Sequence, residues 1–304
     1  MSSGSTSSVR PGFKGYFTLA LIRLVGALPL GWARGLGATL GWLAWQVQDR
    51  GSLTTQRNLQ IAYPEMDDAE RHRLARASMI ETGKLATEIC VVQQCNTAWL
   101  KKHVLKVEGE GYITNEVAKG KGIIFLAPHL GNWEVLGLTL AAYGQLTALY
   151  QPPKQAYLEP LIKKAREKTG GQTVPTNRKG LALLLRSLRS GGITAVLPDQ
   201  NPNLGFGEFA PFFGKPAYTM TTVHGFLQRT DCAVVMGFVK RVPGGFETHF
   251  LPAPKGVYAD DLHESLAALN AGVEACIAHC PEQYQWEYKR FKRHPEGKDQ
   301  YAFR

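Results

Sequence analysis

From residue 105 onward, short apolar runs alternate with segments whose apolar positions recur at helical spacing. The apolar runs have the length of buried strands and cover residues 122–127, 146–150, 193–197, 233–239 and 248–251. The helical segments between and after them are residues 133–143, 155–169, 180–189, 218–229 and 261–280. This alternation predicts an α/β fold in which a mixed, partly parallel sheet is flanked by helices on both faces.

The chain before this region has a helical pattern. Residues 52–104 are predicted to form a helical N-terminal part of the catalytic domain, with an acidic helix start at residues 65–70. We find no internal repeat and no long linker between residues 48 and 304. One catalytic domain is therefore expected over residues 48–304.

Residues 13–47 are rich in Leu, Ala, Gly, Trp and Phe and predict a membrane anchor. Residues 16–32 contain a single charge and residues 35–47 contain none, but neither stretch reaches the roughly 20 apolar residues of a spanning helix. The segment is read either as one imperfect spanning helix or as two short helices in one leaflet, with its three tryptophans at the interface. Buried first helices of a soluble domain are the alternative. Residues 1–12 are rich in Ser and Gly and are expected to be disordered.

The formal net charge of +10 and the pI near 9.4 indicate anionic partners, such as phospholipid headgroups, phosphorylated substrates or an acidic protein. No nucleic-acid partner is expected, because no helix-turn-helix, zinc or RNA-binding motif accompanies the charge. The five cysteines lack paired spacing and fit reduced thiols in the cytoplasm. Since no His/Cys cluster has metal-ligand spacing, neither a metal nor another cofactor is expected.

The most informative stretch is His129-Leu130-Gly131-Asn132-Trp133-Glu134, directly after the first apolar run. On one continuous helix, residues five apart point roughly 140° away from each other, so His129 and Glu134 cannot meet there. A strand, a loop through Gly131 and a helix capped by Asn132 would let them meet at the carboxyl edge of the sheet. A carboxylate that orients a histidine makes a general base. The alternative is a surface histidine near a helix N-cap.

Three other features are predicted to lie near this pair. Arg166 lies on the helical segment before a Gly-Gly stop, where its lysine neighbours could simply form a solvated face. Asp199 follows the apolar run 193–197 and is therefore expected at the same sheet edge as His129. The Phe-rich stretch 204–216 could supply core side chains or the wall of an apolar channel.

The ordered set of these motifs resembles a known family. The block from His129 to Glu134 is similar to the HX4(D/E) signature of the glycerolipid acyltransferase superfamily. The wider pattern resembles the lipid A late (lauroyl/myristoyl) acyltransferases, and the resemblance covers residues 57–65, 129–134, 166, 198–200, 212–214 and 284–292. The superfamily's Pro-Glu-Gly block is not recognisable, and residues 198–200 occupy its place, which leaves the acceptor-binding role of Asp199 open.

The resemblance implies a glycerolipid acyltransferase-like fold. It also implies transfer of an acyl chain from a thioester, commonly on acyl carrier protein, to a hydroxyl of a phosphorylated glucosamine lipid. His129 would act as the base and Glu134 would fix its tautomer, with transfer expected to be direct because no Ser or Cys is placed as a nucleophile. Backbone N–H groups of Gly131, Asn132 and Trp133 could bind the oxyanion.

The remaining expectations concern support residues and location. Arg166 is expected to position a phosphate or the thioester. Asp199 is expected to orient the residues that contact the substrate without contacting it itself. The basic residues 289–293 could meet the carrier protein, the acceptor or membrane phospholipid, or could be a solubilising tail. The expected location is the cytoplasmic side of the bacterial inner membrane. Alternatives are another acceptor, namely a lysophospholipid, an ornithine-type lipid or a glycosyl-inositol lipid, and a non-catalytic binder of membrane or carrier protein.

Overall fold

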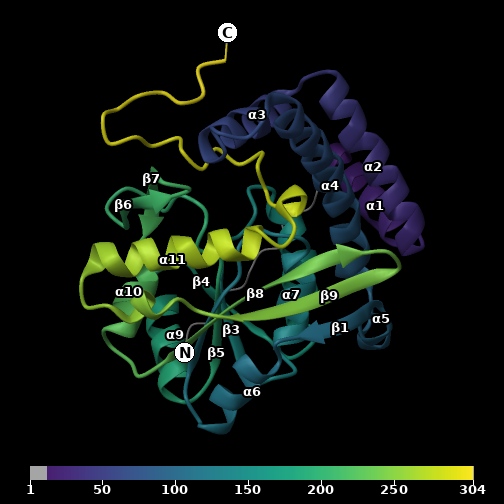
Figure 1. The fold of residues 1–304 in the computed structure, drawn as a ribbon. Helices are drawn as coiled ribbons and strands as arrows, with labels where there is room; N and C mark the ends of the chain where they lie inside the picture. Colours follow the sequence, from purple (N-terminus) through teal and green to yellow (C-terminus); the bar gives the residue numbers. More distant parts are fainter. Residues whose placement is uncertain (1–11, 304) are drawn as a thin grey trace.

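The centre of the molecule is a seven-stranded mixed sheet with the strand order β1-β9-β8-β2-β5-β3-β4 (Figure 1). The structure is a computed structural model and describes residues 12–303, so the disorder expected for residues 1–12 falls almost entirely outside it. The strands are β1 (Val104–Glu108), β2 (Ile123–Leu126), β3 (Leu146–Tyr150), β4 (Gln172–Pro175), β5 (Ile193–Val196), β8 (Ala233–Val242) and β9 (Gly245–Pro252). Every neighbouring pair is parallel except the β8–β9 hairpin. The predicted mixed α/β sheet is therefore present, with β1 and β4 added to the five predicted strands.

Helices cover both faces of the sheet, so the apolar side chains of its central strand β2 are buried on both sides. In β2, Ile124 and Leu126 pack in one core cluster, whereas Ile123 and Phe125 pack in the other. The first cluster includes side chains of α9 (Arg178–Arg189), α10 (Thr222–Leu227) and α11 (Leu262–Ile277). The second includes side chains of α6 (Gly111–Ala118) and α7 (Trp133–Leu140), and α8 (Glu159–Glu167) packs beside α7. Short 3-10 turns complete this part at η1 (Ala156–Leu158), η2 (Lys255–Tyr258) and η3 (Pro281–Gln283).

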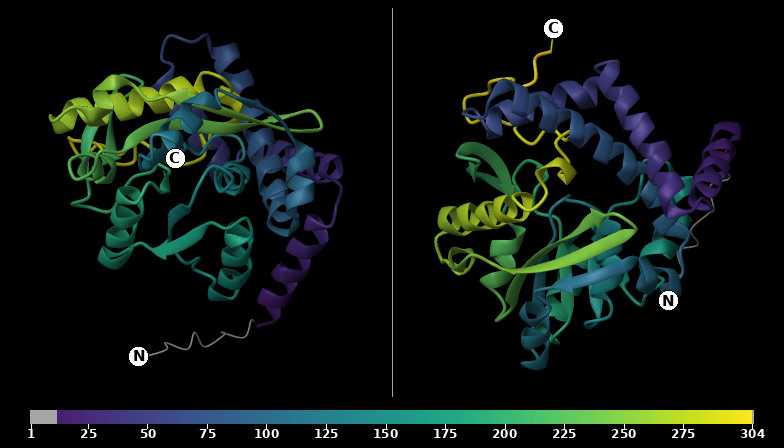
Figure 2. Two further views of the ribbon diagram at one scale, coloured as in Figure 1. Left: turned by 90° about the horizontal axis from the view of Figure 1, so that it is seen from below. Right: turned by 45° about the vertical axis from the view of Figure 1, so that its right-hand side comes forward.

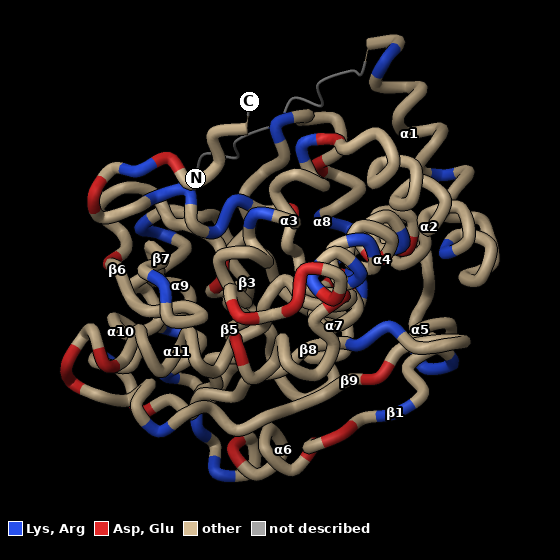
Figure 3. Tube along the Cα trace, turned by 45° about the horizontal axis from the view of Figure 1, so that its top comes forward, with Lys and Arg blue, Asp and Glu red and all other residues tan. Residues whose placement is uncertain are grey.

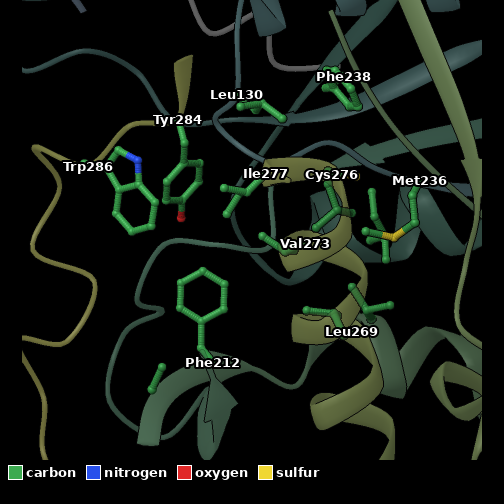
Figure 4. Close-up of a cluster of buried hydrophobic side chains, with 14 of the residues drawn as sticks. Leu130, Phe212, Met236, Phe238, Leu269, Val273, Cys276, Ile277, Tyr284 and Trp286 are labelled. Atoms are coloured by element: carbon green, nitrogen blue, oxygen red, sulfur yellow. The ribbon is translucent and has the colours of Figure 1, made fainter. Parts of the chain in front are cut away.

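The Phe-rich stretch forms a small antiparallel hairpin of β6 (Gly207–Phe212) and β7 (Lys215–Met220). This hairpin shortens the helix predicted over residues 218–229 to α10. Phe212 is 1% exposed, and Figure 4 shows its ring facing Tyr284 and Trp286 beside α11. Phe206 is exposed. The stretch was predicted to supply either core side chains or the wall of an apolar channel, and Phe212 is a core side chain.

Among the described residues, five helices precede the strands of the central sheet, namely α1 (Phe13–Gly26), α2 (Leu30–Gln46), α3 (Arg50–Ala62), α4 (Asp68–Gln94) and α5 (Thr97–His103). Helix α2 lies along α4, and Figure 2 shows both α1 and α2 at the periphery of the molecule. Gly37 and Gly41 of α2 bring the two backbones together at Gly83 of α4. A Cβ on Gly83 would lie 2.1 Å from the Gly37 carbonyl oxygen, so a side chain there would force the helices apart.

The predicted spanning anchor is wrong. Within residues 12–303, no helix has both the length and the apolar character needed to cross a membrane. Residues 13–47 are divided by the turn before Pro29 into helices of 14 and 17 residues. Helix α2 packs against α4 through Ala33, Gly37 and Gly41, which are small, buried and spaced four residues apart. Trp45, expected at a membrane interface, is 4% exposed and packs edge-on against His72.

Candidate active site

The loop after β2 is fixed by the backbone of neighbouring segments. Gly131 has φ +61°, and a Cβ there would lie 1.9 Å from the Val239 carbonyl oxygen, so both the conformation and the close approach require glycine. The Gly131 N–H donates to the Gln283 carbonyl at 3.0 Å. Asn132 then caps α7, as predicted, because its Oδ1 accepts from the Val135 N–H at 3.1 Å.

His129 is held by Asp199. The ring Nδ1 lies 2.8 Å from Asp199 Oδ1, and the His129 backbone N–H donates to Asp199 Oδ2 at 2.9 Å. Burial opposes ionisation of the carboxyl, which is 2% exposed, but the charge of and hydrogen bonds from His129 outweigh it and lower the pKa of Asp199 below its ordinary value. An ionised Asp199 accepts the Nδ1–H, which leaves Nε2 of His129 as the nitrogen that can take a proton.

Sheet register explains this pairing. β2 and β5 are parallel neighbours, with Leu126 opposite Val196. His129 lies three residues beyond Leu126, and Asp199 lies three residues beyond Val196. The expectation that both residues lie at the same sheet edge is therefore confirmed.

Glu134 does not serve as the partner of the histidine ring, so the predicted His129–Glu134 contact is wrong. From the first turn of α7, Glu134 faces α8 and forms a two-pronged ion pair with Arg166, in which Nε lies 3.1 Å from Oε2 and Nη2 contacts Oε1. Burial lowers the pKa of the Arg166 guanidinium, but the hydrogen bond and charge of Glu134 outweigh this and raise it. The guanidinium also lies 5.7 Å from the centre of the Tyr150 ring. Arg166 is thus brought to the site, although through Glu134.

The backbone N–H groups expected to bind an oxyanion are largely occupied. Gly131 N–H is bonded to Gln283, and Asn132 N–H donates to the Val239 carbonyl at 2.9 Å. Trp133 begins α7, where the first N–H groups have no partner within the helix. Its indole packs edge-on against the His129 ring, with centroids 4.8 Å apart.

A buried charge network behind the loop was missed by the sequence reasoning. Glu88 of α4 is fully buried and accepts from Asn132 Nδ2 at 3.0 Å. Its other oxygen pairs with Arg34 Nε at 2.5 Å and lies 2.8 Å from Arg241 Nε. A lone arginine in the apolar α2 and a glutamate on the buried face of α4 were the available signals. Glu88 therefore ties the cap of α7 to α2, α4 and β8.

Next to the loop that holds His129 lies a mostly apolar cavity, part of which is open to solvent. Its lining follows α7 from Trp133 to Leu140 and includes Leu146 on β3. Ala127 and Leu197, which continue the strands toward His129 and Asp199, also line it. The cavity thus extends from the edge of the sheet near His129 and Asp199 along the length of α7.

The C-terminal basic residues are partly structural. Arg290 is 2% exposed and donates to the Tyr218 carbonyl at 2.6 Å and to Thr219 Oγ1 at 2.9 Å. This segment also meets α3, where Asn58 Nδ2 donates to the Trp286 and Tyr288 carbonyls at 2.6 and 2.7 Å. The motif regions 57–65 and 284–292 are thus joined as parts of the scaffold.

Comparisons with known proteins all find similarity to acyltransferases of lipid A biosynthesis. The family model described as bacterial lipid A biosynthesis acyltransferase matches residues 5–293. The lipid A biosynthesis lauroyltransferase of Escherichia coli (strain K12) is 26% identical over 285 residues, which is 92% of this chain and 91% of that protein. The palmitoleoyltransferase and myristoyltransferase of lipid A biosynthesis from the same organism are 24% and 26% identical, covering 93% and 86% of this chain and 92% and 82% of their own lengths.

Proposed function

Because the chain belongs to the bacterial lipid A biosynthesis acyltransferase family, and so is an acyltransferase acting on a lipid A precursor, we propose that it transfers a fatty acyl chain directly from a thioester to a hydroxyl of that precursor. The observation that carries the proposal is the His129–Asp199 pair at 2.8 Å. A buried carboxylate on Nδ1 prepares the opposite ring nitrogen to act as a base.

In the proposed reaction, His129 Nε2 takes the proton of the acceptor hydroxyl while the hydroxyl oxygen attacks the thioester carbonyl. The new C–O ester bond forms, the C–S bond breaks, and the imidazolium returns the proton to the leaving thiolate. Asp199 holds the tautomer and stabilises the imidazolium, which is the role that the sequence assigned to Glu134. General base assistance of this kind accelerates a reaction by about 10²–10⁴-fold.

Direct transfer is favoured over an acyl-enzyme by the surroundings of the thiols. Cys232, Cys276 and Cys280 are buried, and burial raises the pKa of each, the last two to about 12. A protonated thiol is a poor nucleophile. Among the described residues, no serine or cysteine side chain is hydrogen-bonded to His129.

The proposed role of Glu134 is to hold the Arg166 guanidinium beside the reacting groups. Glu134 fixes the guanidinium through two contacts, while the Arg166 side chain remains 38% exposed and can bind an acceptor phosphate or the donor. Trp133 N–H at the start of α7 is the proposed oxyanion donor.

Acyl carrier protein is the proposed donor. Carrier proteins of this kind are acidic, and Lys163 and Lys164 are exposed on α8, two to three residues from Arg166. Opposite charge on the two surfaces would steer the donor toward the site.

The proposed location of the protein is the cytoplasmic side of the bacterial inner membrane. The acceptor is a lipid, and α1 and α2 carry few charged residues (Figure 3). Phe17 and Trp32 on these helices are 66% and 74% exposed. Such side chains suit contact with phospholipid at the membrane surface.

The deciding experiment is a turnover assay of the purified full-length chain with acyl carrier and coenzyme A thioesters as donors, and a lipid A precursor and a lysophospholipid as acceptors. His129→Ala is expected to lower turnover by about 10²–10⁴-fold. His263→Ala, at an exposed histidine of α11, is the matched control and should keep normal turnover. Near-normal turnover of His129→Ala, or carrier binding without turnover in the unaltered chain, would refute the mechanism.

Mass spectrometry of lipid A from cells with and without the gene tests the acceptor in its natural setting. One missing secondary acyl chain is the expected result. Unchanged lipid A together with a changed phospholipid profile would assign a different acceptor.

A further inference from the structure

Gly137 is an unexplained glycine in the middle of α7. Its backbone is helical rather than left-handed, and a Cβ built on it would meet no atom within 4 Å. A glycine inside a helix costs about 1 kcal/mol relative to alanine. Unlike Gly131, whose conformation and close approach both demand glycine, Gly137 is required neither by the backbone nor by packing against a neighbour.

The space beside Gly137 belongs to the cavity along α7. Gly137 lies about one helical turn beyond Trp133 and Glu134, so it lines the middle of the cavity. The polar pair of Glu134 and Arg166 lines it near the first turn of α7, and Leu140 lines it at the other end of the helix. Leu146 of β3 lines it beside Gln172 and Thr173 of β4. The leucines along α7 and β3 form an apolar passage that begins at the Glu134–Arg166 pair, and this arrangement matches the chemistry of an acyl thioester with its hydrocarbon chain.

We propose that Gly137 sets the length of the acyl chain that the enzyme transfers. Without a side chain at this position, the hydrocarbon passes the middle of α7 and reaches the end of the cavity at Leu140 and Leu146. The inference rests on the proposed function, because it needs the reacting thioester beside His129, and it adds the residue that selects among donors. The relatives are named for lauroyl, myristoyl and palmitoleoyl transfer, so donors of different length have to be distinguished within this family.

The test uses Gly137→Ala and Gly137→Leu in the purified full-length chain. Each variant is given an equimolar mixture of saturated acyl carrier thioesters of graded length, and the products are counted by mass spectrometry. Gly137→Ala is expected to favour shorter chains, and Gly137→Leu to lower transfer of the longest accepted chain by at least about 10-fold relative to the shortest, the discrimination typical of a methylene in an apolar pocket. Gly137→Ala should also raise the melting temperature, because alanine favours the helix, and it therefore serves as the variant that keeps the fold.

Gly35 provides the matched control. It too lies inside a helix, α2, with no atom within 4 Å of a built Cβ, but it does not line the cavity. Gly35→Ala and Gly35→Leu should leave the chain-length profile unchanged.

The proposal is overturned if both Gly137 variants keep the normal profile, or if they lower transfer of every chain length by the same factor. Either result would leave the general-base proposal standing, since that proposal depends on His129→Ala. Conversely, an active His129→Ala variant with an altered profile in Gly137→Leu would refute the mechanism and retain the length-setting role.

Discussion

His129 and Asp199 occupy equivalent positions beyond two adjacent parallel strands. Each follows by three residues a member of the in-register pair Leu126 and Val196. The backbone N–H and ring Nδ1 of His129 both contact the Asp199 carboxylate, at 2.9 and 2.8 Å. Strand register brings the two loop segments side by side, so the sheet helps to pre-organise the proposed base and its orienting carboxylate.

Asp199→Asn is expected to lower kcat by about 10²–10⁴-fold with little change in fold. The amide cannot hold the tautomer in which Nε2 is free to accept a proton. The measurement is steady-state turnover, with circular dichroism to confirm folding. Glu134→Gln is the comparison, and it should retain more turnover than Asp199→Asn. The reverse order would restore Glu134 as the residue that orients His129.

The lowered pKa of Asp199 predicts acid sensitivity. A carboxyl whose pKa is lower in the folded chain stabilises the fold at any pH above its ordinary pKa of 3.8. This contribution is lost as the pH falls through the lowered pKa. The free energy of unfolding of the unaltered chain should therefore fall more steeply below about pH 4 than that of Asp199→Asn. Urea unfolding at a series of pH values measures both curves. Parallel curves would show that Asp199 is not stabilised in its charged form.

Much of the sheet and one half of the site could be predicted from the sequence. The capping role of Asn132 follows from local chemistry, and the position of Asp199 follows from the rule that parallel strands end at one edge. The partner of His129 could not be read in this way. It depends on β5 being the sheet neighbour of β2, and strand order is a tertiary property. Glu134 looked favourable because it is near in sequence, yet the first turn of α7 directs it to α8.

The N-terminal helices illustrate a different limit. Apolar composition alone does not distinguish a helix that faces lipid from one that packs on another helix. The spacing of Ala33, Gly37, Gly41 and Trp45, each four residues apart, was the sign that α2 has a packing face. What the sequence could not supply was the partner, the glycine-containing stretch of α4 around Gly83.

Glu88→Gln is expected to destabilise the fold by about 3–5 kcal/mol, because Arg34 and Arg241 lose the charge that compensates them in the interior. It should also lower turnover beyond any loss of folded protein, since Asn132 Nδ2 loses its carboxylate partner at the cap of α7. Urea unfolding and turnover per folded molecule give the two effects.

Glu81→Gln is the matched control for this prediction. Glu81 pairs with the same Arg241, at 2.7 Å from Nη1, but it has no contact with Asn132 among the hydrogen bonds of the described residues. Its replacement should reduce stability and leave turnover per folded molecule unchanged. Equal losses of turnover in both variants would mean that Glu88 contributes stability alone.

Arg166→Ala is expected to raise the KM for donor or acceptor by about 10–100-fold, since a hydrogen bond to a charged group contributes about 1.5–3 kcal/mol. Arg166→Lys should recover only part of this, because an ammonium keeps the charge but cannot form the two parallel hydrogen bonds of a guanidinium. Lys179→Ala, at an exposed lysine of α9, controls for the loss of one positive charge. Steady-state kinetics with each substrate varied in turn will show which one Arg166 binds. If KM is normal for both substrates while stability falls, the Glu134–Arg166 pair only joins α7 to α8, and the cation that receives the substrate lies elsewhere.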